Sequence, residues 1–408
     1  MMSSHIYGPS GVYIMTTRIF DKVFNPAGRS DGVFILIHRK SLVFILFLFL
    51  GIAAGLWMRK LEGTSKEAVA GASPGEEGAF KREIEEIFRF RLQALLSGDT
   101  SNLQNYYDVS QITGQWALNH EIGRTKYLQE WLGKRGLEIV ESKLDLRIVE
   151  ASPRKELGSA SIAQHLILTY RPRGSGQGKE GQMGFRTLHW VELIFKDGRW
   201  LIQKDWYWDP LEADDLEPEI EAIPSVAGRN SGPESWVNGE GRYNRKGAVW
   251  YAERYSGVRM GIGDGRYNPN YKDFTWEGGD CANFASQVLT DKKAGGIPRD
   301  WNWFYSRGQA TTAWVQAAAL VQHLLYSGLA MVVKKGDLKE VWESVKFLEP
   351  GDIIGYEEKG EIVHVSIVTG KDANGYTIVN SHTADRYHVP WDLGWDKYTS
   401  YWLLRITY

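Results

Sequence analysis

Cysteine is nearly absent from this chain of 408 residues, because Cys281 is the single one. One thiol cannot form an internal disulfide, so Cys281 serves packing, metal binding or nucleophilic chemistry. Zinc-binding patterns are also missing: the nine His residues and the single Cys show no metal-ligand spacing, and the sequence has no His-Glu-x-x-His motif. We therefore expect neither a metal centre nor a cofactor.

Neither sign of charge is in excess, since 48 Lys and Arg residues stand against 50 Asp and Glu residues. A chain without a basic excess has no electrostatic reason to bind nucleic acid. Phosphate-cradling loops that end in Gly-Lys-Ser/Thr are lacking too, and the Gly-rich run at 261–265 has no flanking strand and helix. We therefore expect no nucleic acid and no nucleotide among its ligands.

The remaining composition is that of a globular protein, with 43% hydrophobic and 24% charged residues. At about 150 residues per domain, the length predicts two or three domains. Aromatic residues, at 13%, are the one departure from ordinary usage. They suit the aromatic cores of β-rich domains, and they also suit a groove that faces carbohydrate or peptide.

One long hydrophobic run is present, at residues 42–58, where LVFILFLFLGIAAGLWM carries no charge. It is long enough to span a membrane. Basic residues are more frequent before it than after it, which places the N-terminus in the cytoplasm and the rest of the chain outside. The only small-residue cleavage site falls inside the apolar run, so we expect an uncleaved single-pass anchor in the cell membrane. Cleavage would instead give a secreted protein.

The rest of the chain divides by composition. Residues 1–41 form a cytoplasmic tail without a predicted function, and the small, polar, Gly-rich residues 59–79 read as a flexible stalk. A second polar segment, rich in Glu, Pro, Ser and Gly, lies at 211–240 and is typical of a linker. Two folded domains are therefore expected, at 80–210 and 241–408.

The first domain begins with helical spacing and ends with strand-like runs. Apolar residues recur at helical spacing from Ile84 to Leu95, and Ser-Gly-Asp follows as a stop. The hairpin signal Lys-Asp-Gly-Arg at 196–199 joins the last two of four strand-like runs, at 144–150, 160–170, 185–195 and 200–206. Helices before an antiparallel sheet predict an α+β unit. The pattern resembles the cone-shaped nuclear-transport-factor-two-like and cystatin-like domains, a resemblance that implies partner binding rather than chemistry.

The second domain holds the single thiol at the start of a predicted helix. The segment GGDCANFASQVL, residues 278–289, supplies a glycine turn, Asp280 as a helix start and an apolar stripe behind Cys281. At a helix N-terminus the peptide dipole favours the thiolate, so we expect the pKa of Cys281 to be lowered, as a nucleophile requires.

A thiolate nucleophile needs a base, and the base needs an orienting group. IVHVSIVTG, residues 362–370, predicts a strand with His364 near its start, after the turn and strand of LEPGDIIGY. The next strand, TIVNSHT, pairs back across an Asn-Gly turn and carries Asn380 and His382 on one face. Either of these two residues is placed to hold the imidazole in the useful tautomer.

These segments, in this order, resemble the bacterial amidase domain family, within the papain-like superfamily of NlpC-type and CHAP-type cell-wall hydrolases. YNRKGAVWYAERY, the NPNY loop, the aromatic run at 301–305 and the SHTAD segment share the resemblance, which covers about 240–408. It implies a nucleophile at Cys281, a base at His364 and a third residue that is His382 by the family pattern or Asn380 by analogy with CHAP enzymes. Ala282 departs from the hydroxyl residue expected after the Cys.

The sequence thus predicts an α+β protein in which a papain-like cysteine hydrolase fold follows a cone-shaped domain. We expect a cysteine amidase or peptidase that acts on peptide amide bonds. The predicted compartment and the family resemblance suggest that these bonds are in peptidoglycan. Asp280 is interpreted as a helix cap, with orientation of the loop or contact with a substrate amine as its other possible roles. Trp303 and Tyr305 line either a substrate groove or an aromatic core. A non-catalytic scaffold and an acyltransferase are the alternatives, and the sequence does not indicate an oligomeric state.

Overall fold

The computed structural model describes residues 74–174, 179–211 and 242–408. The predicted tail (1–41), the predicted anchor (42–58) and nearly all of the predicted linker lie outside the described residues. Among the residues that are described, no helix combines the length and apolarity that crossing a membrane requires. The described residues all belong to one compact unit.

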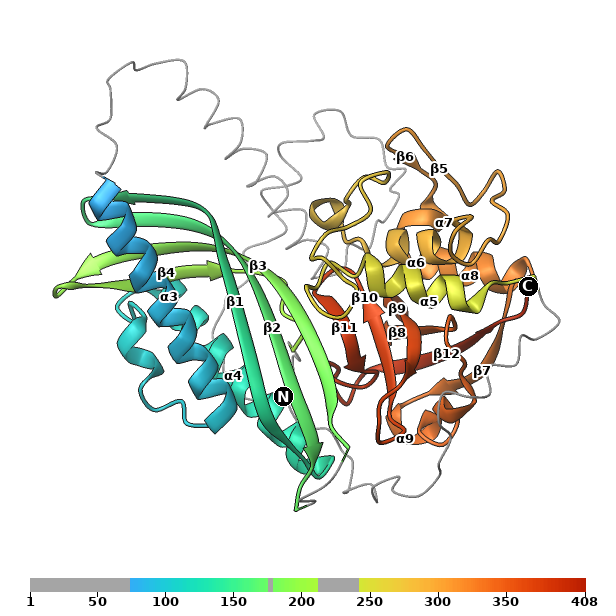
Figure 1. Ribbon diagram of the computed structural model, residues 1–408, viewed down its shortest axis with the longest axis horizontal. Coiled ribbons are helices and arrows are strands. Elements are labelled where there is room, and N and C mark those ends of the chain that lie inside the picture. The colour runs from blue at the N-terminus through green and yellow to red at the C-terminus, as the bar shows by residue number, and fades with distance from the viewer. Residues whose placement is uncertain (1–73, 175–178, 212–241) are drawn as a thin grey trace, which may run out of the picture. The chain divides into compact units, whose positions relative to one another are not determined.

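The N-terminal half packs two long helices against an antiparallel sheet (Figure 1). The helices are α3 (Pro74–Ser97) and α4 (Ile112–Lys134), separated by the short 3-10 helix η1 (Leu103–Tyr106). The strands follow as β1 (Leu137–Arg154), β2 (Leu157–Pro172), β3 (Gly181–Lys196) and β4 (Arg199–Trp206). Helix α3 begins at Pro74, inside the predicted stalk, because Pro at the first turn and Glu76 and Glu77 after it favour a helix start.

The predicted hairpin between β3 and β4 is confirmed. Asp197 and Gly198 both have positive φ, 53° and 82°, as a two-residue turn of this kind requires. Lys196 pairs with Arg199 directly across the turn. All four predicted strand runs of this half lie within β1 to β4, and the helical spacing at 84–95 lies within α3.

The C-terminal half packs helices against both faces of an antiparallel sheet (Figure 1). The helices are α5 (Arg245–Arg254), α6 (Cys281–Thr290), α7 (Thr312–Val315), α8 (Ala317–Tyr326) and α9 (Leu338–Val341), with 3-10 turns η2 (Thr275–Glu277) and η3 (Val345–Phe347). Helices α5 to α8 pack on one face of the sheet, whereas α9 packs with the cluster on the other face. The strands are β5 (Tyr305–Ser306), β6 (Gln309–Ala310), β7 (Ala330–Gly336), β8 (Ile353–Glu358), β9 (Glu361–Lys371), β10 (Thr377–Ser381), β11 (Asp385–Pro390) and β12 (Ser400–Ile406).

One continuous sheet joins the two halves. In the described part of the chain its order is β1-β2-β3-β11-β10-β9-β8-β12-β7, with β4 added beside β3. The junction is the antiparallel pairing of β3 with β11, in which Asp385 faces Arg186 and Tyr387 faces Gly184. The expected α+β class is confirmed, whereas the sequence did not indicate that both halves share a sheet.

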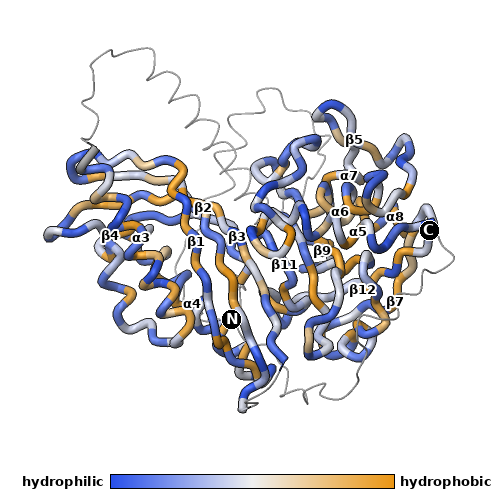
Figure 2. The backbone as a smooth tube through the Cα atoms, viewed as in Figure 1, coloured by the Kyte–Doolittle hydropathy of each residue, from blue (hydrophilic) through white to orange (hydrophobic). Residues whose placement is uncertain are grey.

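Strand β9 lies at the centre of the C-terminal half and separates two cores. Val365 and Ile367 pack with α5, α6 and α8 in one cluster, which also contains Cys281. Val368 packs with Ile354 and Tyr356 in a second cluster on the other face. Much of β9 is hydrophobic (Figure 2), as a strand buried on both faces must be.

Candidate active site

The single cysteine begins helix α6, as the sequence predicted. The loop before it turns through Gly278 and Gly279, whose φ angles of 117° and 115° lie in a region that L side chains avoid. The N-cap residue Asp280 makes no side-chain cap bond. The interpretation of Asp280 as a plain helix cap is therefore wrong.

Asp280 instead fixes the loop that carries the thiol. Its Oδ1 accepts hydrogen bonds from the backbone N–H of Phe274 and from the side chain of Asn283, both at 2.8 Å. Its Oδ2 lies 2.6 Å from Nδ1 of His382. With only 1% of its surface exposed, Asp280 is not available to a substrate amine in this structure.

The backbone N–H groups of Cys281, Ala282 and Val365 act on the thiol of Cys281 as hydrogen-bond donors. Each of them lowers the pKa of the thiol, but burial has the larger effect and raises that pKa to about 11. The expected lowering of the pKa is therefore not found in this structure, because Cys281 is buried, with 7% of the residue exposed.

The predicted base, His364, lies on β9 with its ring beside two aromatic side chains, Tyr356 and Trp395, that stack on each other with centroids 3.9 Å apart. The ring centroids of Tyr356 and Trp395 are 5.8 and 5.4 Å from that of His364. Burial, and then the positive charge of Arg386, hold the pKa of His364 well below its ordinary value. The imidazole is therefore neutral at neutral pH, and its buried Nε2 has no hydrogen-bond partner.

Cys281 and His364 both lie near the point where strands β9 and β10 separate, which we call the fork in the sheet. Strands β9 and β10 pair from Lys371 with Thr377 as far as Ile367 with Asn380, and they pair no further toward His364. Beyond the last β10 pair, the backbone N–H of Val365 is one of the donors that act on the Cys281 thiol. The thiol thus contacts the residue next to His364, although no hydrogen bond joins Cys281 to His364 within the described ranges.

His382, the predicted orienting residue by the family pattern, uses both ring nitrogens elsewhere. Nδ1 faces Asp280, and Nε2 lies 2.6 Å from the carbonyl oxygen of Tyr255. The ring is stacked between Tyr267 and Phe284, with centroid distances of 3.6 and 4.0 Å. His382 therefore positions the loop of Cys281 through Asp280, and the structure does not place it against His364.

The side chain of Asn380, the alternative third residue, also forms its hydrogen bonds away from His364. Its side chain donates to the carbonyl of Ala252 at 3.1 Å and accepts from the backbone N–H of His388 at 2.7 Å. Neither candidate for the third residue therefore orients the imidazole in this structure, which shows a Cys and a His without such a partner.

The two aromatic residues proposed for a substrate groove differ in burial. Trp303 is fully buried in the cluster around α6, and its indole N–H donates to Ser286 at 2.9 Å. Tyr305 packs against the same cluster, and its hydroxyl accepts from the backbone N–H of Lys272 at 2.8 Å. The aromatic-core interpretation therefore describes Trp303, whereas Tyr305 lies at the edge of that core and its place in a groove stays a prediction.

Sequence reasoning missed Arg386, which lies on β11 and is only 4% exposed. Its charge acts on both His364 and Cys281. The only signal for Arg386 in the sequence was its position three residues after the SHT segment and directly after Asp385. The structure shows that both residues are buried. Burial, the first of the causes, lowers the pKa of this guanidinium.

The pH dependence of alkylation tests the state of the thiol. Only the thiolate reacts, and a pKa of about 11 leaves roughly one thiolate in ten thousand at pH 7. We expect the rate of alkylation of the full-length protein by iodoacetamide to rise about tenfold per pH unit up to about pH 11. Mass spectrometry measures it without interference, because Cys281 is the only cysteine. A plateau below pH 8 would show an imidazolium–thiolate pair instead.

Residues 242–404 match the family model described as "Putative amidase domain". The match includes α6 with Cys281, β9 with His364 and β11 with Arg386. It supports the predicted amidase domain family and an activity on amide bonds. No curated protein matches the chain.

Two solved structures show partial likeness. The intermembrane space region of chloroplast protein ARC6 is 10% identical, with 32% of this chain and 95% of that chain covered and a TM-score of 0.23. The "Putative calcium/calmodulin dependent protein kinase II association domain" from Xanthomonas campestris is 17% identical, with 38% and 100% covered and a TM-score of 0.20. At such scores neither likeness bears on the function.

Proposed function

We propose that this chain is a cysteine-dependent amidase or peptidase that hydrolyses amide bonds in peptidoglycan, anchored in the cell membrane with residues beyond 60 outside. The observation that carries the proposal is the single thiol at the start of α6, where backbone N–H groups of Cys281, Ala282 and Val365, the residue after His364, act on it inside the amidase match. The charge-free run at 42–58 supports the anchor and the compartment. The cell-wall substrate follows from that compartment and from the family resemblance.

In the proposed reaction the thiol proton moves to His364 as the sulfur attacks the amide carbonyl. The C–N bond then breaks, the proton passes from His364 to the leaving amine, and a thioester remains on Cys281. Water, deprotonated by His364, hydrolyses the thioester to a carboxylic acid and restores the thiol. The N–H groups of Cys281, Ala282 and Val365 supply donors for the oxyanion formed in both steps.

The charges of the resting site favour general-base catalysis. With the pKa of Cys281 raised to about 11 and that of His364 held low, both groups are neutral at pH 7. A neutral imidazole is a proton acceptor, whereas an imidazolium is not. Because neither Asn380 nor His382 contacts the ring, we propose a Cys–His dyad that lacks a third member at the imidazole.

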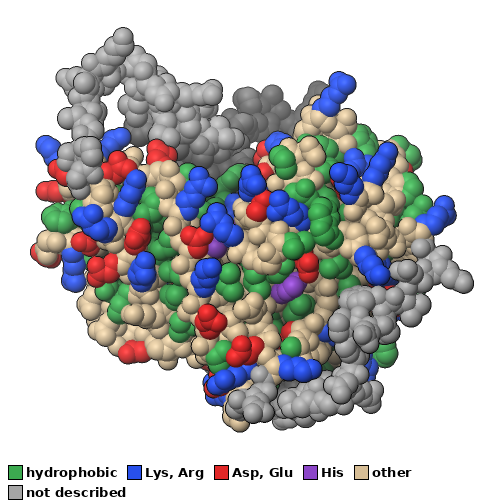
Figure 3. Space-filling model, viewed as in Figure 1, with side chains coloured by type: hydrophobic (Ala, Val, Ile, Leu, Met, Phe, Trp, Pro, Cys, Tyr) green, Lys and Arg blue, Asp and Glu red, His purple; other side chains and the backbone are tan. Residues whose placement is uncertain are grey.

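Two observations concern ligand classes that the proposal omits. Basic and acidic side chains are interspersed on the face shown in Figure 3, so that face offers no single-sign field of the kind that draws nucleic acid. Among the described residues no group of His, Cys, Asp and Glu is arranged to hold a metal ion.

Product analysis tests the proposed reaction. The full-length protein, purified in detergent, is incubated with peptidoglycan in H2¹⁸O, and mass spectrometry follows new amine and carboxyl ends. We expect one ¹⁸O atom in each new carboxyl end, which identifies both the bond and hydrolysis. New amide bonds to an added amine, without ¹⁸O, would show acyl transfer instead, and unchanged peptidoglycan would contradict the proposed substrate.

A further inference from the structure

Arg386 differs from the other fully buried arginines of the described chain. Three of these, Arg91, Arg124 and Arg135, each form an ion pair with a buried carboxylate. Arg386 has no carboxylate within ion-pair distance among the described residues, although it is 96% buried (4% exposed). A guanidinium taken out of water without an anion is costly, so its presence calls for an explanation.

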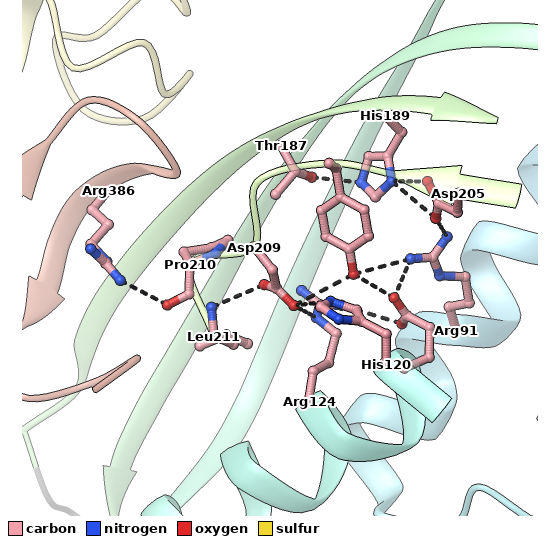
Figure 4. A network of polar contacts seen from close by, with 12 residues as sticks. Arg91, His120, Arg124, Thr187, His189, Asp205, Asp209, Pro210, Leu211 and Arg386 are labelled. Carbon is pink, nitrogen blue, oxygen red and sulfur yellow. Dashed lines mark hydrogen bonds and ion pairs between the residues drawn. The ribbon is translucent and has the colours of Figure 1, made fainter. Parts of the chain in front are cut away.

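The hydrogen bonds of Arg386 are incomplete. Nη2 donates to the carbonyl oxygen of Pro210 at 2.9 Å, and Nε is buried without a partner. The nearby carboxylate of Asp209 is committed to Arg124 and to the backbone N–H of Leu211, both at 2.9 Å. Figure 4 shows this arrangement, with Arg386 reaching Pro210 at the end of the network. Among the described residues, the oxygen bonded to this guanidinium is therefore a neutral carbonyl, and the charge of Asp209 acts on Arg386 only from a greater distance.

Other unpartnered atoms lie beside the guanidinium. Arg386 and His364 both contact the Trp395 ring, at 5.1 and 5.4 Å from its centroid. Ser381, which is paired with Arg386 across β10 and β11, has a buried hydroxyl without a partner, and so has Nε2 of His364. Three buried polar groups on one side of the fork thus lack partners, which is the pattern of a site completed by a ligand.

We propose that Arg386 binds a carboxylate of the substrate, so that the enzyme prefers peptide amides that carry a free carboxyl group close to the bond it cleaves. This inference rests on the proposed function and names its substrate class. Without substrate, the Pro210 carbonyl accepts a hydrogen bond from one donor of Arg386, its Nη2. When substrate binds, its carboxylate takes the place of that carbonyl and also accepts a hydrogen bond from Nε. A planar guanidinium fork matches a carboxylate through two parallel hydrogen bonds, which a lone carbonyl does not do.

A matched pair of substrates tests the inference. Peptidoglycan is used either untreated or with its free carboxyl groups converted to carboxamides by carbodiimide and ammonia. We expect the parent protein to cleave the free-carboxylate form with a kcat/KM about 30-fold higher. In Arg386→Met that preference falls to within about threefold, mainly through KM, and Arg386→Lys retains part of it because it keeps the charge.

Arg405→Met is the control, because Arg405 also donates Nη2 to a backbone carbonyl, that of Phe347, and also has a buried Nε without a partner. It lies on β12 near Glu349 and should leave the preference unchanged. Removal of an unpaired buried charge does not destabilise a fold, so Arg386→Met should melt no lower than the parent. A purely structural arginine would instead lower the melting temperature and leave the substrate ratio unchanged.

The outcomes separate this inference from the proposed function. Equal cleavage of both substrates by the parent, or an undiminished preference in Arg386→Met, would overturn the carboxylate site and leave the amidase in place. Cleavage of neither substrate would contradict the amidase, and calorimetric titration with stem peptides released from the same two preparations then decides the site. Tighter binding of the free-carboxylate peptides that is lost in Arg386→Met supports it, whereas equal or absent binding overturns it.

Discussion

Replacement of Cys281 by Ala is expected to reduce amide cleavage by at least about 10⁴-fold, because the variant has no nucleophile to form the thioester. The fold should remain, since the alanine fits the small space at the start of α6 and leaves the loop bonds of Asp280 in place. We expect the free energy of unfolding to change by no more than about 1 kcal/mol. Initial rates on peptidoglycan and urea unfolding curves provide the two measurements.

Cys281→Ser serves as the matched control for this prediction. It restores a hydroxyl of similar size, but a hydroxyl is a poorer nucleophile beside a histidine without an orienting partner. Its activity should therefore stay within about tenfold of the alanine variant. An alanine variant that keeps more than a tenth of the parental rate would remove Cys281 from the mechanism.

Replacement of Asp392 by Ala is expected to lower the free energy of unfolding by about 3–5 kcal/mol, the largest effect on stability that we predict. Asp392 is fully buried and accepts hydrogen bonds from Arg135 and Trp131 of the N-terminal half and from Tyr376 at 2.5 Å. Without it, Arg135 becomes a buried cation with no anion. Urea unfolding of the full-length protein measures the loss.

Glu138→Ala controls for the removal of an ion pair as such. Its bond to Arg171 is exposed to solvent, so its loss should change the free energy of unfolding by less than about 1 kcal/mol. Arg135→Met combined with Asp392→Leu should recover much of the stability lost in Asp392→Ala, because no unpaired charge remains. Equal effects of Asp392→Ala and Glu138→Ala would show that the two halves do not pack as described.

Local sequence signals predicted most of the helices and strands, but they did not predict which strands pair with one another. Apolar spacing and turn residues act over a few residues, so α3, α6 and the β3–β4 hairpin could be recognised from the sequence. The pairing of β3 with β11 joins residues about 200 apart, such as Arg186 and Asp385. No periodicity within either strand encodes that pairing, and the sequence therefore suggested two separate domains.

The same limit applies to the site. The helix start at Cys281 and the strand at His364 follow from local pattern, whereas the burial that raises the pKa of the thiol depends on packing from distant segments. Asn380 and His382 have the right strand period, but their bonds to Ala252 and Asp280 come from elements that the period does not reveal. Strand alternation narrows the candidates for a third residue, and tertiary contacts decide among them.

The N-terminal half reaches the candidate site through a buried polar network. Asp209 is held by Arg124 and His120 at 2.9 Å each, and it fixes Leu211 directly after Pro210, whose carbonyl contacts Arg386 (Figure 4). Burial alone would raise the pKa of Asp209, yet Arg124 and His120 hold it below its ordinary value, so the carboxylate stays charged at neutral pH. The N-terminal half therefore sets the position of the Pro210 carbonyl oxygen, which accepts the hydrogen bond from the Arg386 guanidinium.

The most direct test of the account is to identify the residue that carries the acyl group during turnover. The full-length protein is mixed with peptidoglycan, quenched in acid and digested, and mass spectrometry locates any added acyl mass. The account predicts an acyl group on the peptide that contains Cys281, formed at a rate sufficient for turnover and absent in Cys281→Ala. An acyl group on another residue, or product formation by Cys281→Ala at the parental rate, would contradict it.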